Sequence, residues 1–223
     1  YDIIPNNAVN YNTYSREGFK EAGIDVNNDL EVEKHHVEKI KLFMASCNNI
    51  IKKYHPDASI FYNWSTHMNN SNMFKYKLYE YNTSYDLEDL PTTWEGYNEF
   101  PLRAKYFSNM GKPVTGMSGK FHTAWGEFGG FKYPNALKYE AASMIAFGAN
   151  VNFGDQLHPS GIIDIETYKN IGSAFSYIKN IEAYGPGGKQ RAKTGLWMNF
   201  DNNTEQATSL LLLDTQTNYV VVN

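Results

Sequence analysis

Apolar and polar positions alternate along the chain in a pattern that predicts helices separated by short strands. The clearest stripe covers residues 30–54, where Val37, Ile40, Met44 and Cys47 recur at three- and four-residue spacing, as on a helix that packs on one side. Other helices are predicted over residues 15–22, 97–110, 135–147, 166–184 and 204–215. Short apolar runs predict strands over residues 58–63, 81–87, 113–118, 150–154, 195–200 and 219–222.

Strands that alternate with helices of about ten residues or more are typical of β-α-β units in a parallel sheet. The run Gly185-Pro-Gly-Gly188 has the composition of a linker. We therefore expect an α/β domain over residues 1–184, a linker over residues 185–191, and a β-α-β unit over residues 192–223 that opens a second, open-sheet domain.

Composition and charge exclude several classes of function. Hydrophobic residues make up 42% of the 223 positions, which is enough for a core. The net charge is −4, and Lys and Arg form no run beyond pairs such as Lys52-Lys53, so no nucleic-acid partner is predicted. Cys47 is the single cysteine, which excludes a disulfide within this chain. No stretch of about 18 apolar residues occurs, so no membrane span is predicted.

Polar and aromatic side chains gather where the predicted strands end. In a parallel α/β barrel this edge carries the active site. Any one cluster is compatible with an ordinary solvated loop, but their accumulation at five strand ends indicates a site. The candidate residues are Asp2, Asn63, Trp64, Glu88, His122, Trp125, Glu127, Asp155, Gln156 and His158.

Glycoside hydrolysis is the chemistry that this set of residues suits. Its transition state needs one carboxylate as nucleophile or base and one carboxylic acid that protonates the leaving oxygen. Asp2 and Glu88 come from different strands, and a separation of about 5–5.5 Å between them would predict retention of configuration. Trp64 and Trp125 can flank a sugar face. The side chains expected to bind sugar hydroxyls are His122, Gln156 and His158.

Metal binding is the competing use of the same residues. His122 with Glu127, or Asp155 with His158, could hold a cation, but neither spacing matches a strong metal signature. The chain has no phosphate-binding glycine loop either. We therefore predict no metal and no cofactor.

Two segments, residues 119–130 (GKFHTAWGEFGG) and 154–161 (GDQLHPSG), resemble barrel hydrolases related to α-L-fucosidases. Residues 87–97 (LEDLPTTWEGY) look like a segment of the classical α-L-fucosidases, with Glu95 inserted. The resemblance implies that residues 1–184 are the C-terminal half of a (β/α)₈ TIM barrel. It also implies that residues 192–223 begin a flavodoxin-like domain, similar to the β-galactosidase trimerisation domain, through which a homo-oligomer can form.

The resemblance also implies roles for single residues. Asp2 matches the nucleophile, Glu88 the general acid/base, and Glu127 is a second candidate for the acid/base role. Relatives often carry several cysteines soon after the nucleophile, where this chain has Asn10-Tyr-Asn-Thr-Tyr-Ser15. The residues expected to line the sugar pocket are His122, Trp125, Asp155, Gln156 and His158.

The resemblance predicts a retaining, exo-acting α-L-fucosidase-like enzyme with a carbohydrate substrate. A β-galactosidase-like hydrolase on the same architecture and a non-catalytic carbohydrate-binding relative remain alternatives. The segment Tyr1–Ile4 has no signal-peptide character and is interpreted as the end of a strand, so we expect the natural protein to be longer. Because half a barrel leaves strand edges unpaired, we expect these 223 residues alone to be inactive.

Overall fold

A computed structural model describes residues 11–68, 72–93, 96–127, 129–198 and 204–222. The chain divides into two compact units, Tyr1–Thr83 and Ser84–Asn223, and each is described by itself. The mixed α/β fold with parallel sheets that the pattern predicted is confirmed.

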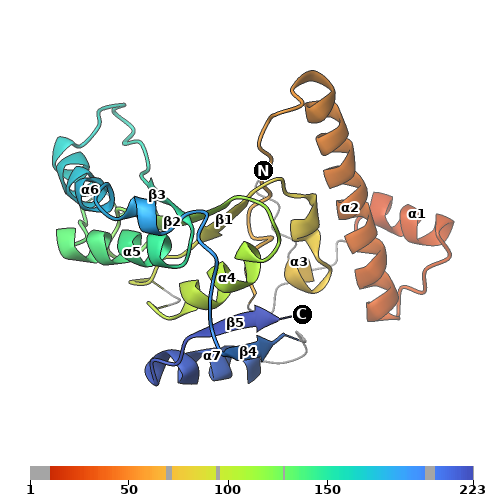
Figure 1. The fold of residues 1–223 in the computed structure, drawn as a ribbon. Coiled ribbons are helices and arrows are strands. Elements are labelled where there is room, and N and C mark those ends of the chain that lie inside the picture. The colour runs from red at the N-terminus through yellow and green to blue at the C-terminus, as the bar shows by residue number, and fades with distance from the viewer. Residues whose placement is uncertain (1–10, 69–71, 94–95, 128, 199–203, 223) are drawn as a thin grey trace. The chain divides into compact units, whose positions relative to one another are not determined.

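The first unit is built around a long helix, α2 (Figure 1). Asn28 caps its start by accepting a hydrogen bond from the backbone N–H of Glu31, which satisfies one of the donors that a helix leaves free at this end. The predicted stripe is buried, because Val37 and Met44 pack against Ile60, Tyr62 and Leu78. The elements of this unit are α1 (Thr13–Glu21), α2 (Asp29–Tyr54), α3 (Asn72–Lys75) and the 3-10 helix η1 (Leu78–Tyr81).

The structure does not assign the predicted strand over residues 58–63 as a strand within the part of the chain that it describes. Two backbone N–H groups of this segment donate to side chains at residues 82 and 83. The N–H of Ile60 donates to the hydroxyl of Thr83, and the N–H of Tyr62 donates to the side-chain oxygen of Asn82. Side-chain acceptors thus satisfy two backbone donors of this apolar segment.

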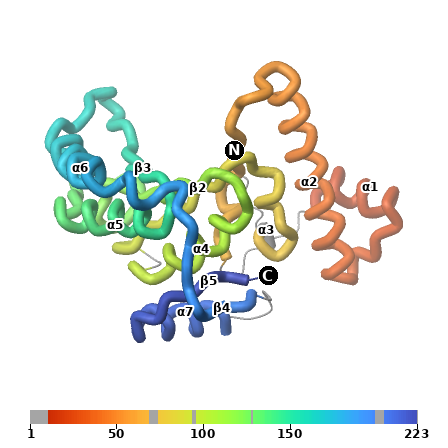
Figure 2. Tube along the Cα trace, in the orientation of Figure 1, coloured from red at the N-terminus to blue at the C-terminus, as the bar shows by residue number. Residues whose placement is uncertain are grey.

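A parallel three-stranded sheet in the order β1-β2-β3 organises the second unit. Its register pairs Glu88 with Met117 and Gly119 with Gly154, so the three strands end close to one another. Helices α5 and α6 lie side by side next to this sheet (Figures 1 and 2). The elements are β1 (Tyr85–Glu88), α4 (Glu99–Ser108), β2 (Val114–Gly119), α5 (Pro134–Ala146), β3 (Asn150–Gly154) and α6 (Ile165–Ile178).

Helices α4 and α5 pack against one face of this sheet. A side chain at Gly116 would collide with Met144 on α5 and Phe100 on α4, so glycine is needed for the close contact between strand and helices. Because side chains alternate along a strand, Asp86 and Glu88 point to the opposite face from their neighbours Tyr85 and Leu87. Candidate catalytic groups therefore lie on the face away from α4 and α5.

A buried ion pair connects the end of the loop after β2 to helix α5. The ammonium of Lys132, which follows this loop, lies 2.9 Å from the carboxylate of Glu140 on α5 and 2.8 Å from the hydroxyl of Ser118 on β2. Ser118 also donates to Glu140, at 2.6 Å. A buried charge pair is tolerated when its remaining hydrogen bonds are made, as they are in this cluster.

A second, two-stranded parallel sheet follows at the end of the chain. The helix predicted over residues 166–184 ends early, because α6 stops at Ile178 and a 3-10 turn, η2 (Glu182–Tyr184), follows. Of the predicted strand 195–200, Asn199 and Phe200 lie outside the described residues. Among the residues described, none of the helices has the length and apolar character needed to cross a membrane. The elements of this segment are β4 (Thr194–Trp197), α7 (Thr204–Asp214) and β5 (Tyr219–Val222).

Candidate active site

Three strand ends meet at the carboxyl edge of the first sheet. β1 ends at Glu88, β2 at Gly119 and β3 at Gly154. Since the strands are parallel, the segments that follow them leave from the same edge, which is where open and closed α/β sheets place their ligands. The candidates Glu88, Trp125 and Asp155 all belong to this edge.

A hydrogen bond joins Glu88 and Trp125 across this edge. The indole Nε1 of Trp125 donates to Oε1 of Glu88 at 2.6 Å, and Glu88 is only 7% exposed. The ring of Trp125 lies over the ends of β2 and β3, where a Cβ at Gly154 would collide with it and a Cβ at Gly119 would lie 3.4 Å from it. Because Gly119 and Gly154 have no side chains, the ring of Trp125 fits over the ends of these strands.

Arg103 on α4 fixes the backbone at the end of β1. Its guanidinium donates to the backbone oxygen of Glu88 at 2.7 Å and to the carboxylate of Asp89 at 3.2 Å. Both side chains of the Arg103–Asp89 pair are buried, at 3% and 5% exposure. Charge-assisted bonds of this kind hold the strand end firmly. Neither Arg103 nor Asp89 was singled out from the sequence.

Asp86 is a further acidic group on the same strand face as Glu88. Burial raises the pKa of Asp86 to about 6, and the nearby charge of Glu88 adds to this effect. The sequence placed Asp86 in the acidic end of this strand but gave it no role. Its two-residue spacing from Glu88 was the signal that marks it.

Glu127 is held differently from Glu88. Hydrogen bonds from Thr123, first from its side chain and then from its backbone, lower the pKa of Glu127, and its Oε2 lies 2.6 Å from the backbone nitrogen of Thr123. The charge of His122 acts in the same direction. These contacts favour the ionised form of Glu127.

The segment after β3 brings Asp155 and Gln156 beside the loop after β2. The ammonium of Lys120, which is buried, lies 3.9 Å from the carboxylate of Asp155. The side-chain oxygen of Gln156 lies against Gly126, where an added Cβ would be 3.1 Å away. His158 is exposed and turns to Ser160, with 2.9 Å between its Nδ1 and the hydroxyl. Lys120 is a charged neighbour that the sequence did not reveal.

Asn63 and Trp64 belong to the first unit. Trp64 has a φ of 65°, a left-handed conformation that a bulky side chain adopts only under constraint, and constraints of this kind cluster at functional sites. The side-chain oxygen of Asn63 accepts the N–H of Trp64 at 2.9 Å. The ring of Trp64 stacks on the buried ring of His67, with centroids 4.6 Å apart. His67 is a further residue that was not singled out from the sequence.

Asp2 lies outside the described residues, so its separation from Glu88 stays untested. Within the described ranges, no group of three or more His, Cys, Asp and Glu side chains is arranged to hold a metal ion.

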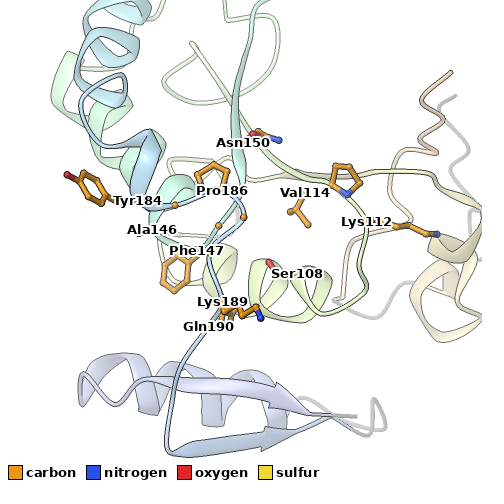
Figure 3. Close-up of a pocket in the computed structure, with 15 residues that line it drawn as sticks. Ser108, Lys112, Val114, Ala146, Phe147, Asn150, Tyr184, Pro186, Lys189 and Gln190 are labelled. Carbon is orange, nitrogen blue, oxygen red and sulfur yellow. The ribbon is translucent and has the colours of Figure 1, made fainter. Parts of the chain in front are cut away.

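A cavity of about 380 Å³ in the second unit lies at the other edge of the sheet (Figure 3). It is lined by Val114 and Asn150, which begin β2 and β3, and by the segment from Tyr184 to Gln190. No carboxylate is among its lining residues. The candidate carboxylates Glu88, Glu127 and Asp155 thus lie outside the lining of this cavity.

The fold described above is similar to a solved structure, alpha-L-fucosidase isoenzyme 2 from Paenibacillus thiaminolyticus. The TM-score is 0.88 and the sequence identity is 30%, over 99% of this chain and 34% of that chain. The chain thus spans about a third of the length of that fucosidase. No protein-family model matches the chain, and no curated protein matches it.

Proposed function

We propose that this chain is part of a glycoside hydrolase of the α-L-fucosidase type, which releases terminal α-L-fucose from glycans with retention of configuration. The observation that carries the proposal is the similarity to the Paenibacillus fucosidase along 99% of the chain. The arrangement at the carboxyl edge supports it, because a buried glutamate, an indole and an aspartate–lysine pair converge there.

In this proposal Glu88 is the general acid/base and Asp2 is the nucleophile. A carboxylate of Asp2 would attack the anomeric carbon while the bond to the leaving oxygen breaks and Glu88 gives its proton to that oxygen. Glu88 would then take a proton from water as the water displaces Asp2, which restores both groups. Glu127 remains the second candidate for the acid/base role.

The proposal includes the finer architecture. Residues 1–184 would be the C-terminal half of a TIM barrel, with the sugar at the edge where Glu88 lies. Residues 185–191 would be a linker, and residues 192–223 would open a flavodoxin-like domain through which copies of the protein can assemble. The residues proposed to contact the sugar are Asn63, Trp64, His122, Trp125, Asp155, Gln156 and His158.

The test uses the longest natural polypeptide that contains this sequence and a panel of aryl glycosides. We expect turnover of the α-L-fucoside. Glu88→Gln should lower kcat/KM by about 10²–10⁴-fold for a poor leaving group such as phenyl, and much less for dinitrophenyl, which needs no proton. Glu166→Gln, an exposed glutamate on α6, is the matched control and should retain full activity.

Azide as an external nucleophile distinguishes the role of Glu88 from the role of Asp2, because the two variants should give different products. With Glu88→Gln it should restore turnover and give the α-fucosyl azide, whereas with Asp2→Gly it should give the β-azide, because only the second variant lacks the covalent intermediate. Turnover of a β-galactoside alone would favour the β-galactosidase-like alternative. Glycan binding without any turnover would favour a non-catalytic relative. Either result would overturn the proposal.

A further inference from the structure

The cavity of about 380 Å³ at the edge where β2 and β3 begin is lined by the amide of Gln190 (Figure 3). Both polar atoms of this side chain, Oε1 and Nε2, are buried, and among the described residues neither has a hydrogen-bond partner. Buried polar groups in folded proteins nearly always have a partner, so this amide indicates a ligand. We propose that the cavity binds a neutral saccharide unit whose hydroxyl groups pair with Gln190.

A packed turn forms the wall of the cavity next to Gln190. The N–H of Gly188 donates to the backbone oxygen of Gly185 at 2.9 Å, and Gly187 has a φ of 82°, which glycine adopts without strain. A Cβ at Gly185 would collide with the backbone oxygen of Ile145 on α5, so the turn lies directly against that helix. The amide of Gln190, two residues after this turn, is therefore attached to a well-packed part of the chain.

The lining groups require a ligand that both donates and accepts hydrogen bonds. Gln190 offers an acceptor in Oε1 and donors in Nε2, while the ammonium of Lys189 can only donate. The hydroxyl of Ser108 donates to the backbone oxygen of Ala104 at 2.6 Å and can still accept. Adjacent hydroxyls of a sugar ring can donate to one atom of an amide and accept from the other. The cavity is also within the range of about 300–1,000 Å³ that is common for small-molecule sites.

A neutral sugar suits this cavity better than an anion does. Lys112 and Lys189 line it, but the ammonium of Lys112 lies over the ring of Tyr85, 5.3 Å from the centroid. Helices α4 and α5 both end at the cavity, and the C-terminal end of a helix carries a partial negative charge. An anion would also leave Oε1 of Gln190 without a donor.

The cavity is separate from the carboxyl edge where Glu88 lies. Val114 begins β2 at the cavity and Gly119 ends it at the carboxyl edge, so at about 3.3 Å per residue roughly 17 Å separate them. Glycosidic cleavage needs carboxyl groups, and none is among the lining residues, so a sugar in the cavity is held and not cleaved. Binding at this site is therefore independent of the proposed function.

Calorimetric titration of the longest natural polypeptide that contains this sequence tests the site, with the methyl glycosides of glucose, galactose and mannose as probes. At least one should bind with a millimolar Kd. Gln190→Leu should weaken that binding by about tenfold or more, because it removes both hydrogen bonds of the amide. Gln216→Leu, at an exposed glutamine outside the cavity, is the matched control and should bind like wild type.

Thermal unfolding separates a ligand-binding amide from a structural one. Within the described residues Gln190 makes no side-chain hydrogen bond, so Gln190→Leu without sugar should unfold at the wild-type temperature or above it. The bound sugar should raise the unfolding temperature of wild type more than that of Gln190→Leu. Because both assays measure binding, they remain informative even if no glycoside is cleaved. Failure of all three probes to bind, equal binding by Gln190→Leu, tighter binding of sulfate than of any sugar, or a lower unfolding temperature of Gln190→Leu would overturn the inference.

Discussion

At the scale of single residues, the missing side chain of Gly154, at the end of β3, makes room for Trp125. Gly154 has no side chain, and the ring of Trp125 occupies the space where a Cβ would stand. The indole is thereby brought within hydrogen-bond distance of Glu88, which lies on a strand that Gly154 does not touch. A glycine in a strand often marks such a close approach.

Gly154→Ala should therefore displace the indole and break its bond to Glu88. We expect a loss of about 1–3 kcal/mol in the free energy of unfolding from overpacking, measured in urea, together with a changed tryptophan fluorescence spectrum. The matched control is Gly172→Ala on α6, where an added Cβ meets nothing within 4 Å and should stabilise the helix by up to about 1 kcal/mol. An unchanged spectrum in Gly154→Ala would show that the ring does not depend on this gap.

At the scale of elements, strand β1 has an apolar face and an acidic face. Tyr85 and Leu87 are buried, while the other face carries Asp86 and Glu88. An acid at a partly buried strand position costs stability when it ionises, because burial penalises its charged form. The strand therefore makes the stability of the second unit depend on pH.

Asp86 sets the direction of that dependence. Its pKa of about 6 in the folded protein lies above its ordinary value of 3.8. Between these values the folded chain binds more protons than the unfolded chain, so the free energy of unfolding falls as pH rises from about 4 to about 6. Asp86→Asn removes this pH-dependent contribution to the free energy of unfolding. Urea unfolding should show the variant gaining up to about 3 kcal/mol relative to wild type between pH 4 and pH 7. A constant difference across this range would contradict the assignment.

Most elements were predictable because periodicity reports which side of an element is buried. The strands at residues 150–154 and 219–222 were predicted with the bounds that the structure has, and the helix at 30–54 begins one residue earlier, at Asp29. Residues 58–63 are not assigned as a strand in the described part of the chain, and side chains of Asn82 and Thr83 accept two of the backbone N–H groups of this apolar segment. The periodicity of apolar residues does not indicate which groups accept the backbone hydrogen bonds of a segment.

The candidate site was predictable in its location and less so in its contacts. Parallel strands bring their ends to one edge whatever the loops contain, so Glu88 at the end of β1 followed from the pattern. The bond between Glu88 and Trp125 spans 37 positions and depends on two glycines elsewhere, and Arg103 reaches Glu88 from a helix. Such contacts arise from packing between elements, which spacing along the chain does not encode.

At the scale of the whole molecule, α4 is the element that joins the two sheets of the second unit. On one side Arg103 holds the end of β1. On the other, the ammonium of Lys105 donates to the side chain of Asn218 at 3.0 Å and to the backbone oxygen of Tyr219 at 2.8 Å, and the amide of Asn109 donates to the backbone oxygen of Val221 at 2.8 Å. The outer edge of β5 is thus capped by side chains of α4.

Lys105 is the centre of this attachment. It is 4% exposed, burial lowers its pKa, and its ammonium also lies over the rings of Phe147 and Tyr219, at 5.2 Å and 4.7 Å from their centroids. Lys105→Met keeps the apolar stem and removes the bonds to β5. If residues 192–223 form a separate domain, as proposed, the loss should loosen β4 and β5 and leave the first sheet unchanged.

Hydrogen exchange measures this directly. In Lys105→Met, the backbone amides of Leu196 and Val220 should exchange about ten- to a hundredfold faster, which corresponds to the loss of about 1–3 kcal/mol for buried hydrogen bonds to a charged group. The amides of Gly116 and Asn152, in β2 and β3, should keep their wild-type rates. Lys169→Met, at an exposed lysine on α6, should change none of them. Equal acceleration in both sheets would mean that the second unit opens as one cooperative body, and the proposed boundary at residues 185–191 would then have no energetic meaning.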